Sequence, residues 1–214
     1  MQGDAANLPF ANSSFAAIIA NHSLEHFDQL DRCLQEIGRV IEPGGALFVS
    51  VPDASTFTDK LYRWLARGGG HVNAFASPHA VANRIQDATG LRLRATTELC
   101  SSLSFLNRRN SPRPLPVRLY FLGGGYEWSL FVYGWVSRRL DRLLHLRSSV
   151  YGWAFYFGEI REPVDTQVNV NVCLRCGSGC RSDVLERNSY TRRTLGISTF
   201  ACPDCGAANP FSGT

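Results

Sequence analysis

Four cysteines in the last quarter of the chain have the spacing of metal ligands. They form two C-x-x-C-G motifs, and the residues are Cys173, Cys176, Cys202 and Cys205. Each motif turns its two sulfurs toward one point, so two motifs supply the four thiolates of a tetrahedral zinc site. The pattern predicts a zinc-ribbon-like module over residues 166–214. Because four cysteines leave no open coordination position, we expect a structural zinc ion without a part in catalysis.

Other interpretations of these cysteines stay open. Cys180 is a further thiol between the two motifs, so a ligand set that includes it is an alternative. Redox chemistry is the rival function of a C-x-x-C motif, although two glycine-backed pairs argue against it. Ligation requires reduced thiols, which indicates a cytoplasmic location. The first residues also lack the basic and apolar regions of a secretory signal.

A second group of chemically active side chains follows an apolar run near the start of the chain. The run is 15–20, and the polar residues after it are Asn21, His22, Ser23, Glu25 and His26. Unbroken apolarity over this length predicts a strand covered on both faces, and residues 46–51 predict another. Ligands of parallel sheets bind beyond the carboxyl ends of the strands. We therefore expect a site at residues 21–26.

A helix is predicted between these two strands. Its apolar positions at helical spacing are Leu30, Leu34, Ile37 and Ile41. Asp28 is available as N-cap, and Pro43-Gly44-Gly45 is expected to end the helix. A crossover of this kind joins parallel strands right-handedly.

The chain beyond this unit alternates between further helices and strands. Residues 56–67 have a helical pattern that ends at three glycines, which we interpret as a loop. A second helix is expected from Ser77, its N-cap, and Pro78 to Gly90. Strands are expected at 91–97 and, strongly aromatic, at 151–160. These elements predict an α/β fold.

Several pieces of the opening segment match a known family in order and spacing. They are Asp4-Ala5, Leu8-Pro9-Phe10, Phe15, Leu24-Glu25-His26, Glu36-Ile37-Gly38-Arg39-Val40 and Pro43-Gly44-Gly45. This arrangement resembles the middle motifs of class I S-adenosylmethionine-dependent methyltransferases. The resemblance implies a partial Rossmann-like methyltransferase sheet with flanking helices, S-adenosylmethionine as cofactor, and methyl transfer to a small-molecule or lipid-linked acceptor.

The resemblance also implies roles for individual residues. Asp4, with Ala5 beside it, takes the place of the family's acidic residue near the adenine, where a carboxylate accepts a hydrogen bond from an exocyclic amine. The segment from Asn21 to His26 corresponds to the methyl-transfer site, and we assign Asn21 to cofactor binding.

The catalytic candidates are His26, His22 and Glu25. We expect His26 to accept a proton if the reaction needs a base, with His22 as second candidate and Glu25 orienting His26 or completing the pocket floor. The alternative is that both histidines only shape the pocket. For His71 the resemblance implies a loop near the substrate entrance, and the alternative is a histidine that orders its own loop.

The family's first strand and glycine-rich cofactor loop have no counterpart ahead of Gly3. The resemblance therefore predicts strands four to seven of the family's sheet and a truncated chain. The first strand present would then have an unpaired apolar edge, which is an aggregation hazard unless a partner covers it.

Residues 108–150 are expected to form an Arg- and Pro-rich linker followed by an aromatic, amphipathic insertion. Its uncharged runs are shorter than the roughly 20 residues that span a bilayer. A helix over 128–147 with Leu140, Leu143 and Leu144 on one side suits either a lid on the sheet or, through 117–147, peripheral contact with a membrane surface.

Composition limits the remaining function classes. The chain has 214 residues, a formal charge of +4, 44% apolar and 19% charged residues, as in a soluble globular protein. Almost all its basic residues are arginines, so basicity is weak support for nucleic acid as a partner.

We predict four segments: a core over 1–107, the insertion over 108–150, the last core strand in 151–165, and the zinc module over 166–214. The alternative function is a non-catalytic zinc-ribbon binding or adaptor protein built on half a methyltransferase fold.

Overall fold

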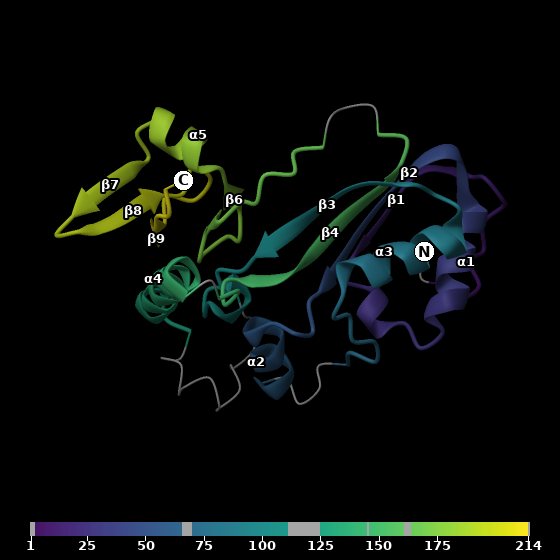
Figure 1. Ribbon diagram of the computed structural model, residues 1–214, viewed down its shortest axis with the longest axis horizontal. Helices are drawn as coiled ribbons and strands as arrows, with labels where there is room; N and C mark the ends of the chain where they lie inside the picture. The colour runs from purple at the N-terminus through teal and green to yellow at the C-terminus, as the bar shows by residue number, and fades with distance from the viewer. Residues whose placement is uncertain (1–2, 66–69, 111–124, 145, 161–163, 214) are drawn as a thin grey trace. The chain divides into compact units, whose positions relative to one another are not determined.

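The computed structural model describes residues 3–65, 70–110, 125–144, 146–160 and 164–213 (Figure 1). Within these residues the chain forms two compact units. The sheet unit comprises Met1–Ser55, Gly68–Glu98 and Gly152–Thr166, and the cysteine unit comprises Thr56–Arg67, Leu99–Tyr151 and Gln167–Thr214. The Pro-rich part of the predicted linker, residues 111–116, and two of the three glycines after position 67 lie outside the described residues.

The sheet unit contains a four-stranded mixed sheet in the order β1-β2-β4-β3 (Figure 1). β1 (Phe15–Asn21) runs parallel to β2 (Ile41–Pro52), and β2 runs antiparallel to β4 (Val150–Gly158). β3 (Leu93–Cys100) is the other outer strand. The parallel pair confirms the predicted strand, helix, strand unit, and the mixed sheet with its helices confirms the predicted α/β fold class.

Two helices pack on the core beside this sheet. α1 (Leu30–Val40) and α3 (Pro78–Thr89) direct apolar side chains toward the central strands. The shared core is formed by Leu30, Leu34, Ile37, Leu47, Val49, Val51, Val81, Ile85, Trp153, Phe155 and Phe157. The predicted cap of α3 is confirmed, since Ser77 Oγ accepts a hydrogen bond from the Ala80 amide at 3.4 Å.

Both predicted end signals of α1 were wrong. The N-cap is Gln29, with no side-chain hydrogen bond, so the helix begins one residue later than a cap at Asp28 requires. At the other end α1 has already finished at Val40, and Pro43-Gly44-Gly45 lies within β2. Gly44 has a positive φ of 79°, which allows the irregular start of this strand.

The burial of the two predicted inner strands differs. β2 is buried along its second half, as expected, but β1 has a single buried residue, Ala20, and Ile19 is 75% exposed. The expectation that β1 is covered on both faces was wrong because β1 is an outer strand with β2 as its neighbour. The predicted unpaired apolar edge is confirmed within the described part of the sheet.

The cysteine unit combines helices with short strands. The helices are α2 (Phe57–Leu65), η2 (Ser104–Leu106), α4 (Glu127–Leu144) and α5 (Ser182–Arg187). β5 (Asn171–Val172) pairs with β6 (Gly179–Cys180), and a three-stranded sheet has the order β7-β8-β9, from Thr191–Thr194, Ile197–Ala201 and Ala208–Pro210. α5 lies between the two cysteine motifs, ahead of β7 and β8. Asp183 in its first turn and Arg187 in its last suit the helix dipole.

The amphipathic helix predicted over 128–147 is present as α4. Its buried positions are Leu130, Gly134 and Ser137, whereas Leu143 and Leu144 are 72% and 60% exposed. The side that packs is therefore not the side that carries Leu143 and Leu144. Among the described helices, none has the length and apolarity needed to cross a membrane.

Candidate functional site

The loop before β1 is hydrogen-bonded to an ion pair within α1. Arg39 Nε and Nη2 donate to the two carboxylate oxygens of Glu36 at 2.8 Å each. Arg39 also donates to the carbonyls of Leu8 and Phe10 at 3.0 and 2.8 Å, and Glu36 accepts from the Leu8 amide at 2.8 Å. The Arg39 hydrogen bond and the Leu8 amide lower the pKa of Glu36 to about 2. These contacts hold the Leu8-Pro9-Phe10 segment against α1.

Asp4 and Ala5 precede this fastened loop. Asp4 is exposed, and its Oδ1 accepts a hydrogen bond from the Ala6 amide at 2.9 Å, while Ala5 is half-buried. Such a bond shapes the turn and uses one of the two carboxylate oxygens. The assignment of Asp4 and Ala5 to the cofactor stays a prediction.

The carboxyl end of β1 is a polar turn held against β2. Ser50 Oγ donates to Asn21 Oδ1 at 2.6 Å, and the His22 amide donates to the Ser50 carbonyl at 3.1 Å. His22 adopts a φ of 46°, a left-handed conformation that is uncommon for residues other than glycine. The turn directs the chain from β1 into η1 (Leu24–His26). Ser50 was not predicted as part of this region.

Glu25 is the buried acid of the turn. Its side chain is 2% exposed, and Oε1 lies 3.5 Å from Nδ1 of His22. Burial alone raises the pKa of Glu25, but the hydrogen bond with His22 and the nearby His22 and His26 rings outweigh this and lower the pKa. The described structure thus pairs Glu25 with His22, the second proton-acceptor candidate. The predicted role in orienting His26 stays untested.

His26 lies beside a histidine from a distant part of the chain. Its Nδ1 is 2.9 Å from the carbonyl oxygen of Gly70, and its ring meets that of His71 at a centroid distance of 4.9 Å and an angle of 73°. A carbonyl oxygen only accepts, so Nδ1 carries the hydrogen and Nε2 is left with a lone pair. The three predicted catalytic residues are therefore adjacent, and His71 joins them.

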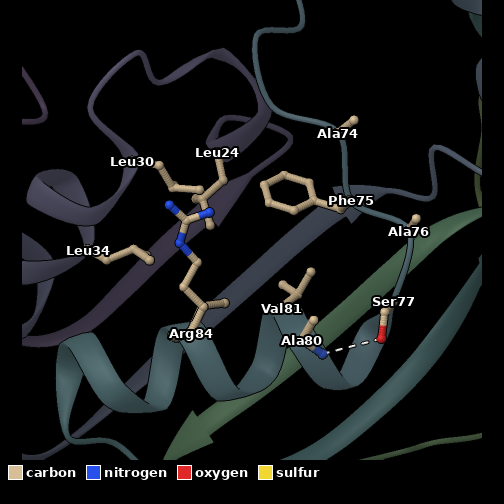
Figure 2. Close-up of a pocket in the computed structure, with 11 residues that line it drawn as sticks. Leu24, Leu30, Leu34, Ala74, Phe75, Ala76, Ser77, Ala80, Val81 and Arg84 are labelled. Atoms are coloured by element: carbon tan, nitrogen blue, oxygen red, sulfur yellow. Dashed lines mark hydrogen bonds between the residues drawn. The ribbon is translucent and has the colours of Figure 1, made fainter.

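A cavity of about 160 Å³ lies between η1, α1 and α3 (Figure 2). Most of its lining is apolar, including Leu24, Leu30 and Phe75. Arg84 is the one charged residue among the described lining, and Figure 2 shows its guanidinium reaching from α3 toward Leu24 and Leu30. Because Arg84 Nε donates to Asp31 at 2.7 Å, its charge is already balanced. The cavity therefore suits an apolar group better than an anion.

The cysteine unit brings the four predicted ligands together. The ligand atoms of Cys173, Cys176, Cys202 and Cys205 all lie within 4.8 Å of one another. The pairs Cys173 with Cys205 and Cys176 with Cys202 are both 3.6 Å apart. Sulfurs bound to one tetrahedral zinc at about 2.3 Å lie about 3.8 Å apart, so these side chains fit the ion.

Both motifs fold into the same turn. The Cys173 amide donates to Ser178 and the Gly177 amide to the Cys173 carbonyl, at 2.9 and 3.0 Å. In the second motif, the Cys202 amide donates to the Ala207 carbonyl and the Gly206 amide donates to the Cys202 carbonyl, both at 2.9 Å. The two glycines have φ of 81° and 70°, a conformation that carries a steric penalty for other residues.

Buried polar residues support the first motif from outside the C-x-x-C pattern. Asn209 is fully buried, donates to the Ala207 carbonyl at 2.7 Å, and lies with its amide nitrogen 3.6 Å from the sulfur of Cys173. Ser102 Oγ donates to the Cys173 carbonyl at 2.7 Å. Cys180 is not part of the four-cysteine group in the described residues. Asn209 and Ser102 carry no sequence signal, because long-range folding alone brings them here.

The first cysteine motif also contacts α4. Arg175 donates to both carboxylate oxygens of Glu127 at 2.7 and 2.8 Å, and Leu174 packs with Leu130 of α4. The Arg175 hydrogen bond lowers the pKa of Glu127. α4 and the first cysteine motif are therefore parts of one packed unit.

Comparison with known proteins bears on the first part of the chain. Residues 1–49 match a family model described as a methyltransferase domain. The chain is 36% identical over 129 residues to malonyl-(acyl-carrier protein) O-methyltransferase of Methylococcus capsulatus, which covers 55% of this chain and 47% of the relative. It is 38% identical over 68 residues to a demethylmenaquinone methyltransferase of Corynebacterium kroppenstedtii, which covers 30% of each chain.

Among solved structures, the chain matches the YcgJ protein of Bacillus subtilis. It is 19% identical, has a TM-score of 0.46, and the match covers 76% of this chain and 71% of that chain. The chain spans about half the length of the first curated relative and less than a third of the second.

Proposed function

We propose that this chain is part of an S-adenosylmethionine-dependent methyltransferase that acts on a small-molecule or lipid-linked acceptor. The observation that carries the proposal is the methyltransferase-domain match of residues 1–49, which ends within β2 and includes the polar turn after β1. In that turn Asn21, His22, Glu25 and His26 lie at the carboxyl end of a parallel strand, where ligands of such sheets bind. By their names, the two curated relatives methylate malonyl-(acyl-carrier protein) and demethylmenaquinone, which supports methyl transfer without naming one acceptor for this chain.

The proposed chemistry needs little from the protein beyond alignment and proton transfer. When bound, S-adenosylmethionine supplies a methyl group on a sulfonium that is already activated for displacement. The chain's residues would hold the acceptor in line with this methyl group and remove its proton. His26 is suited to this because its Nδ1 hydrogen is bound to Gly70 and its Nε2 can accept the proton. His22, which Glu25 contacts, is the second candidate.

Asp4 and Ala5 are proposed to lie at the adenine, and Asn21 at the side of the turn that faces the cofactor. The ion pair of Glu36 and Arg39 supports this, because it fixes the loop that follows Asp4. A fixed loop loses less conformational entropy when a ligand binds.

The second part of the proposal is a structural zinc ion held by Cys173, Cys176, Cys202 and Cys205. It is supported by the closeness of the four sulfurs and by the matching turns of the two motifs. With four thiolates no coordination position is left for substrate.

The exposed apolar side chains of α4 support one further proposal, contact with a membrane surface or lipid-like acceptor through 117–147. Trp128, Leu143 and Leu144 are 65%, 72% and 60% exposed. Aromatic and leucine side chains near arginines are typical of helices in a membrane interface.

The alternative proposal is a non-catalytic zinc-ribbon binding or adaptor protein. The exposed edge of β1, with Ile19 at 75% exposure, favours it because such an edge suits a partner strand. Cofactor binding separates the two proposals.

Isothermal titration calorimetry with S-adenosylmethionine tests the enzyme proposal. We would titrate the chain as given and a form extended by the in-frame codons that precede it. Binding by either form supports the proposal, and no binding by both refutes it. In the binding form, Asp4→Ala should weaken affinity about tenfold through loss of a charged hydrogen bond. Asp87→Ala, at an exposed position of α3, is the matched control and should bind as the parent does.

Native mass spectrometry tests the zinc proposal. We expect one zinc ion per chain, its loss in the double variant Cys202→Ser with Cys205→Ser, and its retention in the controls Cys100→Ser and Cys180→Ser. Retained zinc in the double variant would refute the four-thiolate assignment. Loss of zinc in Cys180→Ser would show that this fifth thiol is a ligand.

A further inference from the structure

A second cluster of potential metal ligands lies in the sheet unit. Ligand atoms of Glu25, His26 and His71 lie within 4.8 Å of one another. Two of these residues are neighbours in the sequence, whereas His71 comes from the loop between α2 and α3. The cluster therefore exists because of the fold.

Glu25 has an unsatisfied oxygen at this position. Its side chain is 2% exposed, and Oε2 has no hydrogen-bond partner in the described structure, although Oε1 lies 3.5 Å from His22. Leaving a buried carboxylate oxygen without a partner costs free energy, and buried charges are normally paired or bound to a metal. Glu25 can therefore accept one further donor or cation at this oxygen.

Backbone hydrogen bonds hold the two segments of the cluster together. The carbonyl of Glu25 accepts from the amides of Val72 and Asn73 at 2.8 and 3.0 Å. The side-chain amide of Asn73 donates to the carbonyls of Leu24 and Phe27 at 3.0 and 2.8 Å. His71 is thus positioned beside Glu25 and His26 by contacts on both sides of the turn. A prearranged ligand set lowers the cost of binding an ion.

The state of His26 also suits metal ligation. Metal-binding histidines commonly donate their second ring N–H to a carbonyl or carboxylate, which fixes the ring and its tautomer. His26 makes this contact with Gly70 at 2.9 Å, so its Nε2 is the nitrogen left for an ion. Because His26 is exposed, the His26 side of the cluster is open to solvent.

We propose that Glu25, His26 and His71 bind a divalent transition-metal ion at the end of β1. Two imidazoles and one carboxylate with open positions are the ligand set of non-haem Fe²⁺ sites, and they also suit Mn²⁺ and Co²⁺. Ligands about 2.1 Å from one ion lie about 3 to 4 Å apart, so the side chains need to close by on the order of 1 Å. Metal binding itself does not depend on the proposed function.

An ion at this site would narrow the class of acceptor for the proposed methyl transfer. This consequence rests on the proposed function. Open positions on a divalent ion take oxygen donors, so the acceptor class would be a molecule with a hydroxyl, carboxylate or enolate oxygen. A bound oxygen also loses its proton more easily. With His26 occupied as a ligand, His22 becomes the residue that accepts the proton.

Cobalt binding to the zinc-loaded full chain tests this site. Thiolate ligands give Co²⁺ intense sulfur-to-metal absorption in the near ultraviolet, whereas a site of nitrogen and oxygen ligands shows visible ligand-field bands alone. We expect one additional Co²⁺ per chain with bands of the second kind. Glu25→Gln and His71→Ala should each weaken this binding at least tenfold, and His79→Ala, an exposed histidine of α3, should leave it unchanged.

The zinc content of the cysteine unit and the far-ultraviolet circular dichroism spectrum serve as folding controls for each variant. Absence of a second cobalt ion from the folded parent would overturn the proposal. Unchanged cobalt binding in a folded Glu25→Gln or His71→Ala variant, or equal loss in His79→Ala, would overturn it as well. S-adenosylmethionine is absent from these titrations, so failure of the metal site is distinguishable from failure of the methyltransferase proposal.

Discussion

Because α1 and α3 approach closely at Gly38, we predict that Gly38→Ala lowers the free energy of unfolding, whereas alanine normally stabilises a helix relative to glycine. A Cβ atom at Gly38 would lie 2.8 Å from Cα of Thr89 and 3.1 Å from the carbonyl oxygen of Ala88. Both contacts are to backbone atoms, which cannot rotate away. The substitution Gly38→Ala therefore requires α1 and α3 to separate locally.

Two opposing effects determine the magnitude. Carbon atoms normally approach to about 3.5–4.0 Å, so the helices must move apart by about 1 Å near Thr89. Overpacking of this kind costs about 1–3 kcal/mol. Replacing glycine by alanine inside a helix contributes about 1 kcal/mol of stability in the other direction. We expect Gly38→Ala to lower the free energy of unfolding by about 1 kcal/mol.

Urea unfolding followed by circular dichroism measures this difference. Gln35, an exposed residue of α1, provides the control pair Gln35→Ala and Gln35→Gly, which reports the helix-propensity effect without a close contact. Gly38→Ala should be less stable than the parent, while Gln35→Ala should be more stable than Gln35→Gly. If Gly38→Ala is instead stabilised by as much as the control pair differs, the helix contact has no energetic consequence and the reasoning is refuted.

Two further predictions concern the ion pair of α1 and the support of the cysteine motif. The pKa of Glu36 is lowered from 4.5 to about 2, so its stabilising contribution is present above about pH 4.5 and is lost as the pH falls toward 2. Thermal unfolding in this range should show a smaller loss of stability for Glu36→Gln than for the parent, and parallel curves would contradict the prediction. Asn209→Ala should weaken zinc binding about 10- to 100-fold in a chelator competition, because the contacts around Cys173 are lost. Asn188→Ala, at an exposed position, should have no effect, and equal affinities in both variants would exclude this role for Asn209.

The sequence determined the features that depend on neighbours along the chain. The alternation of apolar runs and helical spacing predicted β1, α1 and β2 in parallel order, and Ser77 with Pro78 predicted the start of α3. The C-x-x-C-G motifs predicted which four sulfurs approach one another, because each turn is built from consecutive residues and a glycine with positive φ. Such patterns are local, so their geometry can be inferred without the fold.

The tertiary structure alone decided burial and partners. Apolarity predicted that β1 is covered on both faces, but its place at the edge of the sheet leaves Ile19 exposed. The tertiary structure likewise decided that Asn209 supports Cys173, 36 residues away. It also decided that His71 lies beside Glu25 and His26, which are more than forty residues away along the chain. Hydrogen bonds between separate segments depend on the tertiary arrangement of the chain, and the spacing of neighbouring residues does not determine that arrangement.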